Sequence, residues 1–479
     1  MTDSDTGTGT LEAMLQAQRQ AFLSARPEPL SVRTDRIDRL IALMAENDTA
    51  LCDAMSADFG NRSEVQSMIT DVIGTINFAK YCKDKLSHWI KPSSRSVQFP
   101  LGLVGAKAQV RYEPKGVIGI ISPWNFPVNL AFGPLAQVLA AGNRAMLKPS
   151  EFTPATSELL ASLVGKYFAA EEVAVAIGGA DVAKAFSALP FDHIVFTGST
   201  ETGRKVMQAA AENLVPVTLE LGGKSPTIIG KGADLERAGS RIVTGKMMNA
   251  GQICLAPDYL LVPEEKEDGV IAALELAAMD QYPSLLDNPD YASVINDQQF
   301  ERLQSMVEDA RDKGGDVREI NPAGEDFSAS NQRKMPLTII RNPTDEMQAM
   351  REEIFGPVLP VLTYRGIDEA IDRVNSRDRP LGLYYFGDDK AEREAVLSRT
   401  LSGGVTVNDV VFHVSAEDLP FGGVGASGIG SYHGPEGFRE FSHARSVYTQ
   451  PKLDVASIAG LKPPYGERTR KLMHFLAGR

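Results

Sequence analysis

The sequence predicts an α/β protein with two α/β units and a small β element. Short apolar runs alternate with helix-forming segments from residue 117 to residue 220, and a second run of this kind extends from Gly222 to about Gly430. Strands and helices in strict rotation are typical of a doubly wound parallel sheet with helices on both faces. At 479 residues the chain is also too long for one hydrophobic core, so more than one domain is expected.

The first segment, from Leu11 to about Trp89, is predicted to be helical. Its apolar residues recur at spacings of three and four with charged residues between them. Cys52 and Cys82 fall within these apolar stripes. We expect both to be structural, as is usual for a buried free cysteine.

After Pro92 the pattern changes to alternating apolar and polar residues at 96–99 and 108–112, which predicts a β-hairpin. The first α/β unit follows. We expect strands at 117–121, 144–148, 173–177, 193–197 and 216–220, and helices at 128–141, 154–168, 180–187 and 200–213.

The second α/β unit is predicted to contain strands at 260–262 and 337–340. Residues 312–333 are rich in Gly, Asp, Asn and Ser, which favours an exposed loop. The tail from Pro451 is basic and contains the turn-forming residues 463–466. We expect this tail to lie along a partner or the surface.

Composition excludes several classes of function. The hydrophobic fraction of 43% is that of an ordinary globular protein, and the net charge of −13 argues against a nucleic-acid partner. Three cysteines without a CxxC pair argue against disulfides and a metal site. Because there is no signal-peptide pattern in the first ten residues and no apolar run near the length of a membrane span, a cytoplasmic protein is expected.

Cys254 is the first candidate for chemistry. It lies in a small-residue, turn-prone segment, residues 248–258, after a predicted helix. A substrate carbonyl can closely approach a thiol on such a turn, and a nearby backbone N–H can bind the oxygen that becomes negative. A lone cysteine is more often a small buried residue, so other segments must decide between the two interpretations.

Two segments supply the groups that a nucleophilic cysteine needs. Glu220 lies in an apolar run that ends in paired glycines, and burial raises the pKa of a carboxyl group so that it can act as a general base. Asn125 follows the predicted strand 117–121, and its side-chain amide can complete an oxyanion hole.

Residues 198–203, with the sequence GSTETG, predict a phosphate-binding turn. They follow a strand and open a helix, so free N–H groups and the positive end of the helix dipole would face a diphosphate. Lys148 and Glu151 lie at the carboxyl end of a neighbouring strand, where ligands of open α/β sheets bind. A nucleotide site is therefore expected there, although a Rossmann GxGxxG motif is absent.

Together these segments resemble the aldehyde dehydrogenase superfamily from about Arg19 to about Val447. Residues 147–151, 196–203 and 352–357 carry further matches. Residues 252–259 and 419–425 resemble class 3 enzymes, and residues 407–413 with 431–434 resemble bacterial coniferyl-aldehyde dehydrogenases.

The resemblance implies NAD(P)-dependent oxidation of an aldehyde to the carboxylic acid, without a metal. Cys254 would attack the aldehyde carbon, Asn125 and the Cys254 N–H would hold the oxyanion, and hydride would pass to NAD. Glu220 would then activate the water that hydrolyses the thioester. The implied cofactor-binding residues are Trp124, Lys148, Glu151, Gly198, Ser199, Gly203, Leu221, Gly222, Glu353 and Phe355.

The carboxylate of Glu151 accepts hydrogen bonds from a ribose 2′-OH but repels a 2′-phosphate, so NAD is favoured over NADP. Because Lys148 partly compensates, NADP acceptance stays open. The implied substrate pocket is mostly apolar and suits an aromatic aldehyde, such as coniferyl aldehyde, or a medium- to long-chain aliphatic one. Its residues are Phe126, Thr244, Met248, Ile253 and Phe412. Thr244 stands where animal class 3 enzymes often have a bulky aromatic, which implies a longer or wider pocket.

Three alternative functions compete with this interpretation. A CoA-acylating aldehyde dehydrogenase has less need of a base such as Glu220, and a non-catalytic structural protein of this fold would be expected to lack the catalytic residues. A cysteine hydrolase needs a histidine base in a recognisable motif near the thiol, and the six histidines offer none.

The resemblance also implies a domain organisation. Residues 1–95 and 114–221 would form the NAD-binding domain, and residues 222–439 the catalytic domain. Residues 96–113 and 440–460 would be oligomerisation strands, followed by the tail at 461–479. Hairpin strands with open edges predict at least a homodimer.

Overall fold

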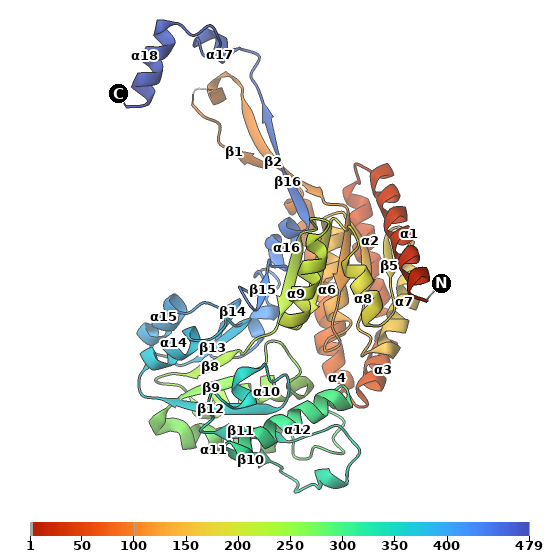
Figure 1. Cartoon of the computed structure of the whole chain (residues 1–479), viewed down its shortest axis with the longest axis vertical. Coiled ribbons are helices and arrows are strands. Elements are labelled where there is room, and N and C mark those ends of the chain that lie inside the picture. Colours follow the sequence, from red (N-terminus) through yellow and green to blue (C-terminus); the bar gives the residue numbers. More distant parts are fainter. Residues whose placement is uncertain (1–2, 100, 479) are drawn as a thin grey trace.

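The computed structural model describes residues 3–99 and 101–478, which form two α/β bodies and a projecting β arm (Figure 1). The first body contains a six-stranded sheet in the order β15-β7-β6-β3-β4-β5. Its strands are β3 (Val117–Ile121), β4 (Arg144–Lys148), β5 (Val173–Val175), β6 (His193–Gly198), β7 (Val217–Leu221) and β15 (Gly428–Ile429). Neighbouring strands are parallel except β15, which runs antiparallel to β7.

Helices cover both faces of this sheet because successive side chains of a strand point to opposite faces. The helices of this body are α1 (Asp3–Ser24), α2 (Leu30–Ala45), α3 (Asp48–Phe59), α4 (Glu64–Ser67), the π-helical turn η1 (Met68–Ile73), α5 (Gly74–Trp89), α6 (Asn129–Ala140), α7 (Pro154–Tyr167), α8 (Ala180–Ser187) and α9 (Thr200–Ala211). Ile118 and Ile120 pack into one apolar cluster with α2, α5 and α6, whereas Val117 and Ile121 pack into another with α1, α8 and α9.

The second body has a seven-stranded sheet in the order β10-β11-β12-β9-β8-β13-β14, parallel except at β10. Its strands are β8 (Pro226–Ile229), β9 (Tyr259–Pro263), β10 (Asp316–Ile320), β11 (Leu337–Arg341), β12 (Val358–Tyr364), β13 (Gly382–Phe386) and β14 (Gly404–Val407). Its helices are α10 (Leu235–Met247), α11 (Glu267–Gln281), α12 (Asp297–Asp312), α13 (Gln348–Arg351), α14 (Ile367–Asn375) and α15 (Lys390–Arg399). The predicted α/β fold class is confirmed, while the domain boundaries stay a prediction.

The arm is a three-stranded antiparallel sheet of β1 (Ser93–Arg95), β2 (Lys107–Pro114) and β16 (Ser442–Thr449), with β2 in the centre. It projects from the first body, with α17 (Val455–Ile458) and α18 (Glu467–Leu476) at its far end (Figure 1). α16 (Gly434–Glu440) leads into β16. The tail is thus partly helical and lies away from both α/β bodies of its own chain.

Two predicted elements are wrong in position or type. The strand predicted at 96–99 lies at Ser93–Arg95, because only these residues pair with β2 before the chain enters a loop. The loop predicted at 312–333 contains the edge strand β10. This strand has charged residues at exposed positions and pairs on one side, so its sequence has no apolar run.

Candidate active site

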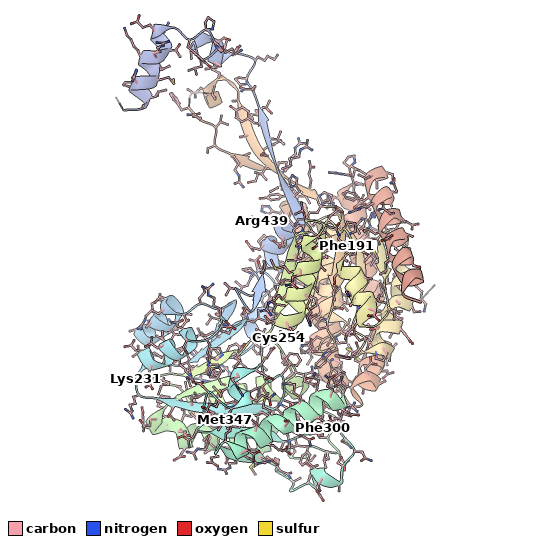
Figure 2. The ribbon with its side chains drawn as sticks, viewed as in Figure 1. Phe191, Lys231, Cys254, Phe300, Met347 and Arg439 are labelled. Carbon is pink, nitrogen blue, oxygen red and sulfur yellow. The ribbon has the colours of Figure 1, made fainter. Side chains whose placement is uncertain are left out.

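Cys254 lies where the two α/β bodies meet (Figure 2). Asn249, Ala250 and Gly251, which precede it, have φ angles of 53°, 52° and 74°. Three consecutive left-handed residues make a sharp turn, and non-glycine residues adopt this conformation only where the surroundings enforce it. A Cβ atom at Gly251 would meet the Gly356 carbonyl oxygen at 2.4 Å, so this position requires glycine. Cys254 is half-buried next to this turn.

The surroundings of Cys254 favour the protonated thiol. Burial raises the pKa of the thiol, and the carboxyl groups of Glu353 and Glu220 raise it further. Hydrogen bonds from the backbone N–H groups of Cys254 and Leu255 lower this pKa. Because the thiolate is the nucleophile, a base or a positive group must activate Cys254 in the reaction.

Glu220 lies on β7 with 2% of its surface exposed. Within the described residues, neither carboxyl oxygen has a hydrogen-bond partner. Burial raises its pKa well above the usual range, and the neighbouring Glu440 adds to this shift. A buried carboxyl group without a partner has the properties of a general base that accepts a proton from water near neutral pH.

Asn125 is buried in the loop between β3 and α6. Its Nδ2 donates a hydrogen bond to the Gln252 carbonyl oxygen over 3.1 Å. Nδ2 of Asn249 donates to that same oxygen over 3.3 Å and to the Asn125 carbonyl oxygen over 3.1 Å. The loop that carries Asn125 is therefore joined directly to the segment that carries Cys254.

Lys148 ends β4, and its side chain is 1% exposed. Its Nζ donates hydrogen bonds to the Pro149 carbonyl oxygen and to the Glu151 carboxylate, both over 3.0 Å. Glu151 itself reaches solvent. The two predicted ribose-binding side chains therefore lie side by side at the carboxyl edge of the sheet.

The turn at 198–203 connects β6 to α9. Ser199 is the N-cap of α9, and its Oγ accepts a hydrogen bond from the Thr202 N–H over 3.3 Å. A Cβ atom at Gly203 would meet the Leu221 side chain at 2.5 Å, and one at Gly198 would meet the Phe196 ring at 2.6 Å. Both glycines therefore allow close packing, which is a structural role independent of any bound phosphate.

Glu353, from the second body, reaches the end of β7. A Cβ atom at Gly222 would overlap the Glu353 carboxyl group, so this approach requires glycine. Burial, with Asp258 nearby, raises the pKa of Glu353 to about 8. Phe355 has a φ of 49°, and its ring lies 5.3 Å from that of Trp124 in an edge-to-face contact. The predicted nicotinamide-side residues are thus near each other and near Cys254.

The predicted pocket residues separate into two groups. Phe126, Met248 and Ile253 belong to one apolar cluster with Cys254. Phe412 is 63% exposed, and Thr244 is exposed with its hydroxyl bonded to the Ser240 carbonyl oxygen and the Gln281 side chain. Within the described residues, neither of these two belongs to the apolar cluster that contains Cys254.

Sequence reasoning missed an aromatic group around the thiol. Tyr384 donates a hydrogen bond to the Leu255 carbonyl oxygen over 2.6 Å, and Cys254 adds to the raised pKa values of Tyr384 and Tyr432. Burial lowers the pKa of His413 to about 4 and that of His433 to about 3, so both imidazoles are neutral. In the sequence, residues 407–413 and 431–434 carry only a resemblance to known enzymes, and nothing in their spacing indicates that they meet.

Across residues 3–99 and 101–478, no group of three or more His, Cys, Asp or Glu side chains is arranged to hold a metal ion. In the same part of the chain, no helix has the length and apolar character needed to cross a membrane.

Comparisons with known proteins identify the family of this chain. The model of the aldehyde dehydrogenase family matches residues 4–447. A probable coniferyl aldehyde dehydrogenase of Caulobacter vibrioides is 53% identical, over 99% of this chain and 98% of its own. A coniferyl aldehyde dehydrogenase of a Pseudomonas species, strain HR199, is 51% identical over 98% and 97% of the two chains.

A solved structure extends the comparison to the fold. The NAD+ complex of aldehyde dehydrogenase from Bacillus cereus is 28% identical to this chain, with a TM-score of 0.83 over 93% of this chain and 90% of the other. The family match spans both α/β bodies and most of β16. This chain therefore belongs to the aldehyde dehydrogenase family.

Proposed function

We propose that this chain oxidises an aromatic aldehyde of the cinnamyl type, such as coniferyl aldehyde, to its acid through a thioester on Cys254. The observation that carries the hydrolytic step of this proposal is the unpartnered, buried carboxyl group of Glu220 at the same junction as Cys254 and Asn125. The two coniferyl aldehyde dehydrogenase relatives support the substrate class. An aldehyde dehydrogenase that hydrolyses its thioester needs such a base, whereas transfer of the acyl group to CoA does not.

In the proposed reaction, the Cys254 sulfur attacks the aldehyde carbon, and the thiol proton passes to a base, for which Glu220 is the candidate. The Asn125 amide and the Cys254 N–H bind the oxygen that becomes negative. Glu220 then releases the thiol proton to solvent. After oxidation to the thioester, the Glu220 carboxylate takes a proton from water, and the resulting hydroxide attacks the acyl carbon. The acid leaves, and the Cys254 thiolate is restored.

NAD(P) is the cofactor in this proposal, and when bound it supplies the hydride acceptor. The described residues fit such a group at the carboxyl edge of the first sheet. Lys148 and Glu151 would hold the adenosine ribose, the N-terminus of α9 at Ser199 would face the diphosphate, and Glu353, which has an unpartnered buried oxygen, would hold the nicotinamide ribose. Trp124, Leu221 and Phe355 would complete the nicotinamide side.

A panel of aldehydes ranked by kcat/KM tests the proposed substrate class. We expect coniferyl and cinnamyl aldehydes to exceed acetaldehyde by at least about tenfold, because burying an aromatic ring adds roughly 1–3 kcal/mol of binding over a methyl group. The panel also includes straight-chain aldehydes of six to twelve carbons, and each assay is repeated with CoA. Faster turnover of the aliphatic series, or acyl-CoA as the product, would contradict the proposal.

Glu151→Gln is expected to narrow the preference for NAD over NADP. The carboxylate that repels a 2′-phosphate is lost, while the neutral amide can still bond to a ribose hydroxyl. The measurement is the ratio of kcat/KM values for the two cofactors in the parent and the variant. Glu158→Gln, on α7, is a control that should leave the ratio unchanged. An unchanged ratio in Glu151→Gln would remove the assigned role of this residue.

The chain is expected to assemble at least as a homodimer through the arm. β1 and β16 are the two edges of its sheet, and large apolar side chains on the arm and tail are exposed. Examples are Phe99, Leu103, Ile458 and Phe475. Light scattering at working concentration should give at least twice the chain mass of 51.8 kDa. A particle of the single-chain mass would contradict the expected assembly.

A further inference from the structure

A completely buried ion pair lies beside the Asn125 loop. Arg62, just after α3, donates from one guanidinium nitrogen to the carboxylate of Asp71 over 2.7 Å, and neither side chain is exposed to solvent. Desolvation offsets much of the attraction in a buried pair, so such a pair is weak evidence for a gain in stability. The contacts of this pair point to a role other than stability.

Asp71 holds the start of α6. It lies in the π-helical turn η1, between α4 and α5, and its second carboxyl oxygen accepts hydrogen bonds from the backbone N–H groups of Val128 and Asn129 over 3.2 and 3.1 Å. A carboxylate is favourable at a helix N-terminus, where these N–H groups have no partner within the helix. Such π-helical turns are rare and occur often at functional sites.

Arg62 holds the other end of the same loop. Its second terminal nitrogen donates to the Asn125 carbonyl oxygen over 2.9 Å, and its guanidinium carbon lies 4.9 Å from the Phe59 ring centre and 5.2 Å from that of Phe126. The planar guanidinium is suited to donate in two directions while it stacks on aromatic rings. The loop from Asn125 to Asn129 is thus fixed at both ends by one ion pair.

The network continues to the turn before Cys254. Nδ2 of Asn249 donates to the same Asn125 carbonyl oxygen, and the Gln66 side chain, on α4, accepts from the Asn249 N–H over 2.9 Å. Residues 62–71 therefore contact both the loop of the proposed oxyanion donor and the turn of the proposed nucleophile.

We infer that Arg62 and Asp71 are a positioning pair, which fixes the Asn125 loop so that its side-chain amide stays aligned with the oxygen that becomes negative. This inference rests on the proposed role of Asn125. Arg62 touches no reacting atom in this account and acts only through Asn125. Displacing such a donor by about 1 Å can cost on the order of 100-fold in rate.

The test is a double-mutant cycle between the ion pair and Asn125. Arg62→Met with Asp71→Asn removes both charges, while the Asn oxygen can still accept from the start of α6. In the parent background we expect kcat to fall roughly 10- to 100-fold, with the KM for NAD within about twofold. Asn125→Ala alone should lower kcat roughly 100- to 1000-fold, as loss of one oxyanion donor does. In the Asn125→Ala background, the change of both Arg62 and Asp71 should lower kcat by less than about threefold, because the amide that the pair positions is already absent.

The inference would be overturned if the paired change lowered kcat equally in the parent and Asn125→Ala backgrounds, or in neither. The proposed role of Asn125 would then still stand. Near-normal turnover of Asn125→Ala would instead overturn the proposed role of that amide. If the double variant does not fold, Arg62→Lys replaces it. Lysine keeps a positive charge beside Asp71, but it lacks the planar group that donates both to Asp71 and to the Asn125 carbonyl oxygen. Arg62→Lys should therefore keep the melting temperature of the parent protein and have a lower kcat. Full kcat in Arg62→Lys would also overturn the inference.

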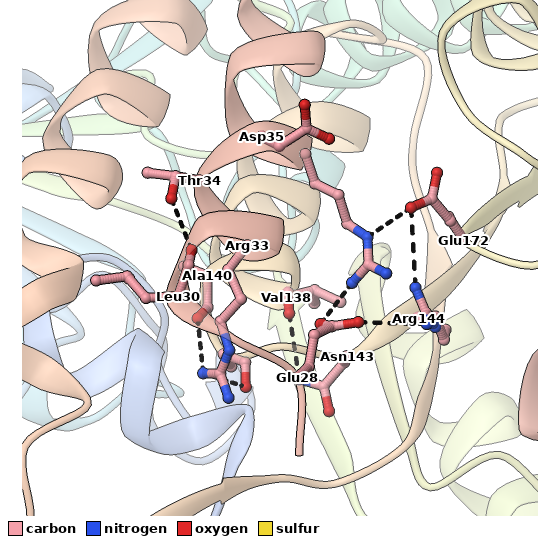
Figure 3. Close-up of polar contacts among 12 residues, drawn as sticks. Glu28, Leu30, Arg33, Thr34, Asp35, Val138, Ala140, Asn143, Arg144 and Glu172 are labelled. Carbon is pink, nitrogen blue, oxygen red and sulfur yellow. Dashed lines mark hydrogen bonds and ion pairs between the residues drawn. The ribbon is translucent and has the colours of Figure 1, made fainter. Parts of the chain in front are cut away.

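Arg36→Met is the matched control. Arg36 is as buried as Arg62 and bonds to Glu28 and Glu172. The cluster also includes Arg144, and Figure 3 labels Glu28, Glu172 and Arg144. Arg144 begins β4, so this cluster lies at the opposite edge of the sheet from Lys148. We expect Arg36→Met to lower the melting temperature and leave kcat unchanged. This outcome separates a general loss of stability from the positioning effect.

Discussion

Glu220→Gln is expected to release about one NADH per active site and then stall. The amide has nearly the volume of the carboxyl group but cannot accept a proton from water, so the thioester on Cys254 should form and persist. Loss of a positioned general base typically lowers the rate of the step it assists by roughly 100- to 10,000-fold, and here that step is hydrolysis of the thioester. The measurement is a rapid-mixing trace of NADH, with a burst close to the concentration of sites and a very slow steady phase.

If Glu220 also removes the proton from the Cys254 thiol, the burst should be slower with the same amplitude. The thiol needs such a base because burial raises its pKa. Glu440→Gln is the control, since Glu440 adds to the raised pKa of Glu220 but is not the proposed base. It should keep steady turnover, with the acid limb of its pH profile shifted to lower pH because a neighbouring negative charge is gone. Full steady turnover in Glu220→Gln would contradict the proposed role of this residue.

Cys254→Ala is expected to form no NADH, neither as a burst nor in the steady state. Without the sulfur, no thiohemiacetal forms, and the aldehyde hydrogen has no route to the cofactor. Binding of NAD should persist, which cofactor titration by fluorescence can verify. Cys52→Ala is the matched control, because Cys52 is a buried cysteine of the first apolar cluster and should be needed only for packing. Sustained NADH production by Cys254→Ala would assign the nucleophile to another residue.

Much of the fold was predictable because its elements have regular local patterns. The strands β3, β4 and β6 are short apolar runs with clear flanking signals, and the structure places each within a residue of the prediction. β10 was missed because an edge strand that pairs on one side only, with charged exposed positions, resembles a loop in sequence. The first strand of the arm was displaced because its bounds depend on pairing with β2 and not on its own side chains.

A site residue was predictable only where both its own side chain and the residues next to it in the sequence indicate its role. Glu220 lies in an apolar run, so its burial could be inferred before its surroundings were known. The contacts of Arg62 and Asp71 with the Asn125 loop span more than fifty residues of sequence, and the π-helical turn that directs Asp71 inward has no sequence signature. The exposed position of Thr244 likewise depends on how α10 packs against α11.

Intact-mass spectrometry of Glu220→Gln, mixed with NAD and coniferyl aldehyde and quenched within seconds, shows directly whether a thioester forms on Cys254. We expect one added acyl group per chain, located by peptide mapping on the peptide that contains Cys254, with the parent protein unmodified under the same conditions. An unmodified Glu220→Gln chain after a full burst, or an acyl group on any residue other than Cys254, would contradict this expectation.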